Sequence, residues 1–227
     1  MKVLLVSATY NEIEPFVERL EKKVVQNNLY SGKINLIDFD CLYTGVGIAA
    51  TTYYLTKHLQ NNKYNLIVNA GIAGIYNPEL EIGDIVNVQS DCFADLGIDD
   101  NGVFRNVFEE KFQAPSAFPF QNGWLINSSD YSFTHSLPNI KGITVNTATG
   151  RIERIGFLKE KYNPDIETME GAAFMYTCLM ESVKFIQLRS ISNIVEPRNK
   201  KNWNISLAIK NLNSALIDIF TMQNFKI

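Results

Sequence analysis

The chain of 227 residues has few of the residues that hold metals or build covalent frameworks, with only three cysteines and two histidines. Cys41, Cys92 and Cys178 are odd in number, lie far apart and form no Cys-x-x-Cys pair. This excludes a disulfide framework and a zinc knuckle, and it favours a reducing compartment. His58 and His135 show no paired-ligand spacing, so we expect no bound metal.

A surplus of basic residues is also missing, because 21 Lys and Arg stand against 24 Asp and Glu, a formal net charge of −3. Without that surplus, binding to nucleic acid through phosphate neutralisation is not expected. The apolar run after Lys2 spans only residues 3–6, too short for a signal peptide. No window approaches the roughly 20 apolar residues of a membrane span. We therefore expect a cytoplasmic protein that binds neither nucleic acid nor membrane.

The usual cofactor and nucleophile motifs are absent or incomplete. The chain has no Walker motif and no G-x-S-x-G elbow for a catalytic serine. Gly45-Val-Gly-Ile-Ala-Ala50 matches a relaxed dinucleotide fingerprint, which also needs an acidic residue about 20 positions further on. The chain has Asn69-Ala-Gly71 there instead. A tight turn between a strand and a helix is the favoured interpretation, and we expect no cofactor.

Short apolar runs alternate with segments of helical periodicity. Hydrophobic residues make up 46% of the chain, enough for a substantial core. We expect strands at 3–6, 34–42, 66–69, 83–88, 143–145, 167–170 and 185–189, and helices at 13–24, 48–59, 151–161, 171–181 and 203–222. This alternation predicts an α/β fold with a central, largely parallel or mixed twisted sheet flanked by helices. Because no linker divides the chain, we expect a single domain over residues 1–227.

An aromatic-rich excursion interrupts this pattern at about residues 91–126. Its phenylalanines and Trp124 are scattered among turn residues without periodicity. A segment of this length without regular structure is typical of a functional excursion.

Three polar residues stand at the ends of predicted strands, where α/β sheets gather their binding sites. Glu12 follows the first strand and also fits a capping box with Thr9. Glu170 precedes an apolar helix, where a carboxylate is costly to bury without a partner. Asn193 follows an apolar strand and could equally be a turn former.

Taken together, these residues belong to an ordered set of motifs that resembles the purine nucleoside phosphorylase and methylthioadenosine nucleosidase superfamily. The motifs are Ser7-Ala-x-x-x-Glu12, Thr44-Gly-Val-Gly47, Asn69-Ala-Gly-x-Ala-Gly74, Gly83-Asp-Ile-Val86, Met169-Glu-Gly-Ala-Ala173 and Arg189-Ser-Ile-Ser-Asn193. Within the superfamily, residues 93–97 and 192–198 resemble the futalosine hydrolases most closely. The resemblance implies a nucleoside phosphorylase-like fold and cleavage of the N-glycosidic bond between ribose and a purine.

The resemblance also implies roles for individual residues. Glu12 would activate the attacking water, while Glu170 would hold the ribose hydroxyls and favour the developing positive charge. Met169 would pack against the sugar. Arg189 would lower the pKa of the carboxylates, although a structural ion pair is an equal alternative. Further substrate contacts would come from Val46, Ile72 and Thr149.

The N-terminal segment favours water over phosphate as the nucleophile. Phosphorylases of the superfamily carry a glycine-rich, arginine-containing loop there. This chain instead has Glu12, Glu14 and Glu18, and its first arginine is Arg19. A cluster of carboxylates repels a phosphate dianion but suits a neutral water molecule.

Asn193 stands where adenosine-type nucleosidases of the superfamily have an aspartate. Its amide offers one acceptor and one two-hydrogen donor, which suit a protonated N7 and the 6-oxo group of hypoxanthine. Adenine would set donor against donor, at a cost of roughly 1–3 kcal/mol. The stacking phenylalanine of the relatives has no counterpart in residues 147–150, so we expect an aromatic of the excursion to cover the base.

The resemblance, together with Asn193, therefore implies the activity of the futalosine hydrolases, which release hypoxanthine and leave dehypoxanthine futalosine in menaquinone biosynthesis. The excursion, with Arg198 or Lys200, would receive the carboxybenzoyl tail. Alternatives are a methylthioadenosine/S-adenosylhomocysteine or aminofutalosine nucleosidase, an inosine-type phosphorylase, and a silent nucleoside-binding protein. We expect a homodimer or higher homo-oligomer, with no partners beyond nucleoside and water.

Overall fold

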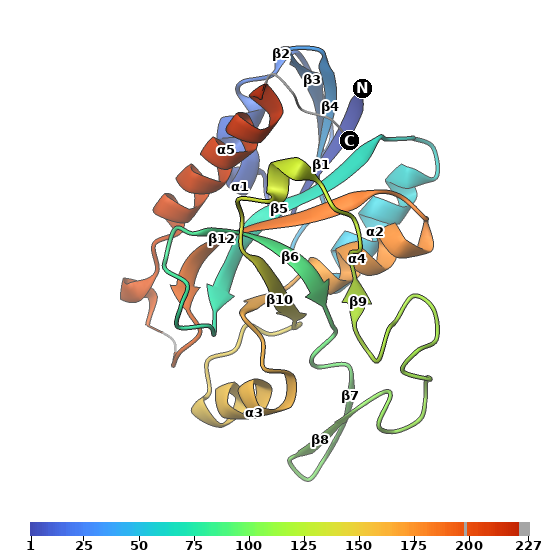
Figure 1. Cartoon of the computed structure of the whole chain (residues 1–227), viewed down its shortest axis with the longest axis vertical. Coiled ribbons are helices and arrows are strands. Elements are labelled where there is room, and N and C mark those ends of the chain that lie inside the picture. Colours follow the sequence, from blue (N-terminus) through green and yellow to red (C-terminus); the bar gives the residue numbers. More distant parts are fainter. Residues whose placement is uncertain (198, 223–227) are drawn as a thin grey trace.

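The computed structural model describes residues 1–197 and 199–222, which form a mixed sheet flanked by helices (Figure 1). The strands are β1 Lys2–Ser7, β2 Glu21–Gln26, β3 Leu29–Ile34, β4 Ile37–Tyr43, β5 Leu66–Ile75, β6 Ile85–Asp91, β7 Gly97–Asp100, β8 Val103–Asn106, β9 Leu125–Ile126, β10 Asn139–Thr144, β11 Ile166–Thr168 and β12 Phe185–Ile194. The helices are α1 Tyr10–Val17, α2 Ile48–Leu59, α3 Ile152–Tyr162, α4 Gly171–Met180 and α5 Ile205–Thr221, with short 3-10 turns η1 Ser132–Thr134 and η2 Lys200–Asn202.

The strand order is β11-β10-β6-β12-β5-β1-β4-β3-β2, with β9 paired to β6. The pairs β1–β4, β1–β5, β5–β12, β6–β10 and β10–β11 are parallel, whereas β6–β12 and the β2-β3-β4 meander are antiparallel. An additional antiparallel pairing joins β11 to β5. This pairing brings the far edge of the sheet back to its centre. The predicted α/β fold with a mixed central sheet is confirmed.

Two helix pairs cover the two faces of the sheet. Figure 1 shows α1 and α5 on one side and α2 and α4 on the other. On the first side, Phe16, Phe39 and Phe220 contact one another edge-on in a fully buried core. On the second side, Leu55 of α2 and Phe174 of α4 are both fully buried in a separate core. The apolar burial on both faces explains why the central strands are nearly continuous apolar runs.

The helix expected over residues 13–24 is wrong beyond its first half. Helix α1 ends at Val17, and residues 21–26 form β2, paired with β3. The strand expected over 34–42 is likewise two strands, β3 and β4. Asn27 and Asn35 adopt left-handed φ values of 52° and 53° at the two tight turns of this meander. Asparagine tolerates that conformation, so both turns can close. The segment therefore pairs as hairpins, although the spacing of its apolar residues is helical.

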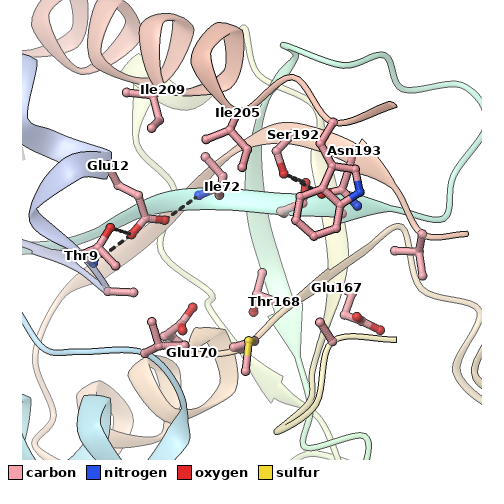
Figure 2. Close-up of a pocket in the computed structure, with 18 of the residues that line it drawn as sticks. Thr9, Glu12, Ile72, Glu167, Thr168, Glu170, Ser192, Asn193, Ile205 and Ile209 are labelled. Carbon is pink, nitrogen blue, oxygen red and sulfur yellow. Dashed lines mark hydrogen bonds between the residues drawn. The ribbon is translucent and has the colours of Figure 1, made fainter. Parts of the chain in front are cut away.

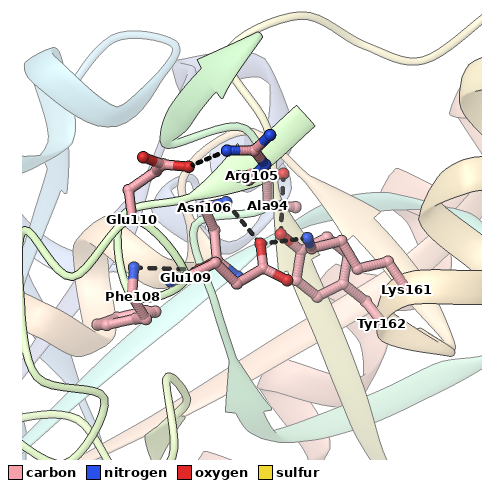
Figure 3. A network of polar contacts seen from close by, with 8 residues as sticks. All are labelled: Ala94, Arg105, Asn106, Phe108, Glu109, Glu110, Lys161 and Tyr162. Atoms are coloured by element: carbon pink, nitrogen blue, oxygen red, sulfur yellow. Dashed lines mark hydrogen bonds and ion pairs between the residues drawn. The ribbon is translucent and has the colours of Figure 1, made fainter. Parts of the chain in front are cut away.

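The excursion begins at the end of β6 and contains the β7–β8 hairpin and β9. Figure 3 shows polar contacts that fix it to α3. Glu109 accepts from the Asn106 amide at 2.8 Å and from Lys161 Nζ, and Tyr162 donates to the Ala94 carbonyl at 3.3 Å. The excursion is therefore a docked segment of the fold.

Among residues 1–197 and 199–222, no helix combines the length and the apolar character needed to cross a membrane.

Candidate active site

A cavity of about 410 Å³ lies at the carboxyl ends of β1, β5 and β12 and is closed on one side by the start of α5 (Figure 2). Glu12, Glu170 and Asn193 all line it, although they are distant in the sequence. The structure thus brings together the three residues that the sequence singled out as catalytic.

Glu12 lies in the first turn of α1, and its two carboxylate oxygens have different surroundings. Oε2 accepts from Ser7 Oγ at 3.1 Å, from the Thr9 amide at 2.9 Å and from Thr9 Oγ1 at 3.0 Å. Oε1 accepts from the Ile72 amide of β5 at 3.2 Å. The predicted capping interaction with Thr9 is therefore present. Because the cap uses Oε2, Oε1 retains capacity for a further donor at the cavity.

Glu170 stands at the N-cap of α4 and is buried. Its Oε1 accepts from the Gly47 amide at 2.9 Å, in the glycine turn that follows β4. Gly47 has a φ of 94°, a conformation that side chains with a Cβ rarely adopt. The turn that mimics a dinucleotide fingerprint therefore presents a backbone donor to this carboxylate.

Burial raises the pKa of Glu170 above its ordinary value, and the nearby charge of Glu12 adds to the rise. The Arg189 guanidinium and the amides of Gly47 and Met169 act in the opposite direction. Desolvation is the largest of these effects.

Arg189 is fully buried behind the cavity, and it is not among the residues that line it. A Cβ on Gly71 would collide with Arg189 Nη1 and would lie 3.0 Å from Glu12 Oε1. The missing side chain at Gly71 therefore lets the guanidinium pass over β5 close to Glu12. Arg189 Nε and Nη2 are buried without a hydrogen-bond partner among the described residues. The cation acts on the site through charge from behind its wall.

Another carboxylate, Asp91, is buried beneath the start of α4. Thr144 Oγ1 donates to its Oδ1 at 2.9 Å, and Gln187 Nε2 donates to its Oδ2 at 3.1 Å. Burial raises the pKa of Asp91 to about 6. A Cβ on Gly171 would collide with Asp91 Oδ2, which explains why a glycine follows Glu170.

Asn193 lies at a bulge of β12, where the register with β5 shifts between Ile191 and Asn193. Its Nδ2 donates to the Ile194 carbonyl at 3.0 Å, and Ser192 Oγ lies 2.8 Å from its Oδ1. A backbone carbonyl can only accept, so it fixes which end of the amide carries the hydrogens. The second Nδ2 hydrogen remains available to a ligand.

Of the other residues expected to bind substrate, Val46, Ile72, Thr149 and Met169 line the cavity. Arg198 lies outside the described residues. No residue of 91–126 is among the described residues that line the cavity, so the structure does not support the expected cover of the base by an aromatic of the excursion.

Two residues that line the cavity were not predicted from the sequence as site residues. Trp203, just before α5, supplies an aromatic wall, continued by Ile205 and Ile209. Its signal was a lone tryptophan at the end of a polar linker. Glu167 on β11 adds a third carboxylate, whose Oε1 accepts from the Thr149 amide at 2.8 Å and whose Oε2 accepts from Tyr76 Oη at 3.0 Å.

Within the part of the chain that the structure describes, no group of three or more His, Cys, Asp or Glu side chains is arranged to hold a metal ion. The cavity instead presents three carboxylates, an oriented amide and an apolar wall. That combination suits a ligand with several hydroxyl groups and a flat polar ring.

Comparisons with known proteins place this arrangement in context. A family model described as the phosphorylase superfamily matches residues 2–221. A futalosine hydrolase from Streptomyces coelicolor is 30% identical over 184 residues, covering 78% of this chain and 77% of that protein. The solved structure of futalosine hydrolase of Helicobacter pylori strain 26695 matches with a TM-score of 0.79 and 17% identity over 96% of both chains. A methylthioadenosine/S-adenosylhomocysteine nucleosidase from Colwellia psychrerythraea 34H, in complex with adenine, matches with a TM-score of 0.82 and 17% identity, over 100% of this chain and 97% of that one.

Proposed function

The chain belongs to the phosphorylase superfamily, and we propose that it is a nucleosidase that hydrolyses futalosine to hypoxanthine and dehypoxanthine futalosine, a reaction of menaquinone biosynthesis. The observation that carries this proposal is the orientation of Asn193. Its amide nitrogen is fixed by the Ile194 carbonyl in the cavity that also holds Glu12 and Glu170.

In the proposed reaction, Glu12 positions a water molecule and takes its proton as the water attacks the anomeric carbon. This role is supported by the different partners of its two carboxylate oxygens. Oε2 is held by the turn after β1, whereas Oε1 accepts from the Ile72 amide of β5. A carboxylate within hydrogen-bond reach of the water is suited to general-base work.

Glu170 is proposed to accept hydrogen bonds from the ribose hydroxyls. Its negative charge stabilises the oxocarbenium-like transition state that forms as the bond to the base breaks. Met169, beside it in the lining, packs against the sugar. Arg189 helps to keep Glu170 ionised, because its charge opposes the effect of burial on the pKa.

Asn193 is proposed to bind the leaving base. N7 takes up a proton from solvent as the bond to the ribose breaks. Asn193 Oδ1 accepts from the resulting N7–H, and its free Nδ2 hydrogen donates to the 6-oxo group. The base then departs as neutral hypoxanthine. Trp203 lines the cavity and is proposed to supply the aromatic surface that the sequence lacks at residues 147–150.

The test is incubation of the protein with futalosine in buffers with and without inorganic phosphate, followed by chromatography of the products. Hydrolysis predicts equal release of hypoxanthine in both buffers and a free sugar product. A phosphorylase would need phosphate and form a sugar 1-phosphate, and a silent binding protein would release no base.

One rival substrate has a structural observation in its favour. The apolar wall of Trp203, Ile205 and Ile209 also suits the methylthio group of methylthioadenosine. Methylthioadenosine, S-adenosylhomocysteine and aminofutalosine are therefore included in the same assay. Preferred release of adenine would show that one of these adenine nucleosides is the substrate in place of futalosine. The protein would still be a nucleosidase.

The proposal includes a cytoplasmic location, supported by three buried free cysteines, and a homodimer or higher homo-oligomer. Exposed apolar residues on α2 and the excursion support self-association, among them Tyr53 and Phe112 at 57% and 67% exposure. Light scattering tests the oligomeric state. Arg198 remains proposed as the partner of the tail carboxylate.

A further inference from the structure

We propose that Glu167 is a specificity-determining residue that accepts a hydrogen bond from N1–H of a 6-oxopurine, next to the contact that Asn193 makes with the 6-oxo group. This inference rests on the proposed function, because it assigns the second half of base recognition at the same site.

The strand register places the two side chains on either side of one glycine. Glu167 of β11 and Asn193 of β12 both pair with Gly74 of β5. Residues paired across neighbouring strands point to the same face of a sheet, and adjacent strands lie about 4.8 Å apart. The two Cα atoms are therefore separated by about 10 Å, with no side chain between them. Side chains of this length can converge above Gly74 on neighbouring atoms of one ligand.

Gly74 keeps this gap open. A Cβ at this position would lie 2.8 Å from Val195 Cγ2 and 3.2 Å from Asn193 Nδ2. Figure 2 shows Glu167 and Asn193 on one side of the cavity and Glu12 on the other. The cavity thus has one end that suits water and sugar and another end that suits a base.

Glu167 is held as an acceptor that still has capacity to bind a ligand. It is buried, and its two oxygens accept from the Thr149 amide and the Tyr76 hydroxyl. Each carboxylate oxygen can accept two hydrogen bonds, so both retain one. No ion pair with Glu167 occurs among the described residues. A ligand donor is therefore the natural partner for its remaining capacity.

The edge of hypoxanthine matches this pair of groups. Its O6 accepts and its neighbouring N1–H donates, so Asn193 Nδ2 and the Glu167 carboxylate satisfy both. Adenine presents an amine and an unprotonated N1 there, which would face the Asn193 donor and the Glu167 acceptor. Sites built on buried hydrogen bonds reject such mismatched ligands strongly.

The alternative is that Glu167 only anchors the segment at Thr149. Glu167→Gln separates the two roles, because the amide still accepts from the Thr149 amide but also offers a donor to the ligand. We measure kcat/KM for hypoxanthine release from futalosine and for adenine release from aminofutalosine. The expected result is a loss of about 10- to 100-fold for futalosine with an unchanged or higher value for aminofutalosine. Equal changes for both substrates would overturn the proposal.

Tyr76→Phe is the matched control. It removes one anchor of Glu167 and keeps the carboxylate, so the ratio of the two kcat/KM values is expected to stay near that of the wild type. A collapse of the ratio in Tyr76→Phe equal to that in Glu167→Gln would show that anchoring alone sets it, and would contradict the proposal.

A second measurement needs no variant. Calorimetric binding of hypoxanthine and 1-methylhypoxanthine to the wild-type protein tests the N1–H contact, and we expect at least tenfold weaker binding of the methylated base. Equal binding would overturn the inference. Failure of the proposed function is distinct, because it would leave the wild type unable to release hypoxanthine from futalosine.

Discussion

The main-chain amide of Ile72 donates to Glu12 Oε1 at 3.2 Å, so β5 holds the carboxylate that the N-terminal turn of α1 presents. The other oxygen, Oε2, is surrounded by donors from Ser7 and Thr9. A helix cap and a cavity carboxylate are therefore combined in one residue.

Glu12→Gln is expected to lower kcat for futalosine by about 10²- to 10⁴-fold with little change in KM, because the amide cannot take a proton from water. Steady-state kinetics measure both values, and circular dichroism controls for folding. A kcat near that of the wild type would mean that Glu12 is only a helix cap.

Glu170 is expected to set the acid limb of the pH profile. Burial raises its pKa, so on acidification it takes up a proton at a higher pH than an ordinary glutamate. It then loses the charge that is proposed to favour the oxocarbenium-like state. The midpoint of the acid limb of kcat/KM should therefore lie above the ordinary glutamate pKa of about 4.3. Glu170→Gln should be slower and lack this limb. A limb that persists unchanged in the variant would assign it to another group.

Asn193→Asp is expected to relax the choice of base. An aspartate can accept from the 6-amino group of adenine but repels the 6-oxo group of hypoxanthine. The ratio of kcat/KM for futalosine to that for aminofutalosine should fall by at least about tenfold. If the ratio stays at the wild-type value, the Asn193 amide does not distinguish the groups at the 6-position of the base.

Asp91 is expected to make folding stability depend on pH. Its folded pKa of about 6 lies above the unfolded value, so the folded state binds the proton more tightly. The stabilisation is complete below about pH 4 and is lost as the pH rises through 6. Asp91→Asn removes this dependence, and a flip of Gln187, whose Oε1 has no described partner, can restore the hydrogen bond.

Urea unfolding of both proteins at pH 4.5 and pH 7.5 measures the effect. Relative to the wild type, the variant should gain up to about 3 kcal/mol at the higher pH. A difference between the two proteins that is the same at both pH values would place the titration elsewhere.

Local pattern was enough to predict some elements. Helix α2 was predicted at its observed bounds because Leu55 and Leu59 lie on one buried face after a glycine turn. The end of α1 and the start of β2 could not be predicted from the spacing of apolar residues. Pairing with β3 determines that Val24 and Val25 lie in a strand. Helical spacing of apolar residues does not report whether a hairpin partner is present.

Some residues of the candidate site could likewise be predicted from the sequence, and others could not. Glu12, Glu170 and Asn193 stand at or after the ends of predicted strands, so the rule that binding sites gather there identified them. Glu167 was missed because its place depends on the antiparallel pairing of β11 with β5, which no local pattern reveals. Trp203 was missed because it stands in a polar segment, and its packing against the cavity depends on how α5 docks.

The most direct test of the account is a competition between equal concentrations of futalosine and aminofutalosine, which differ only at the 6-position of the base. Chromatography of the wild-type reaction at low conversion gives the ratio of hypoxanthine to adenine released. We expect an excess of hypoxanthine of about 100-fold or more, as in sites whose hydrogen-bonding groups reject the wrong partner. Equal release, or an excess of adenine, would contradict it.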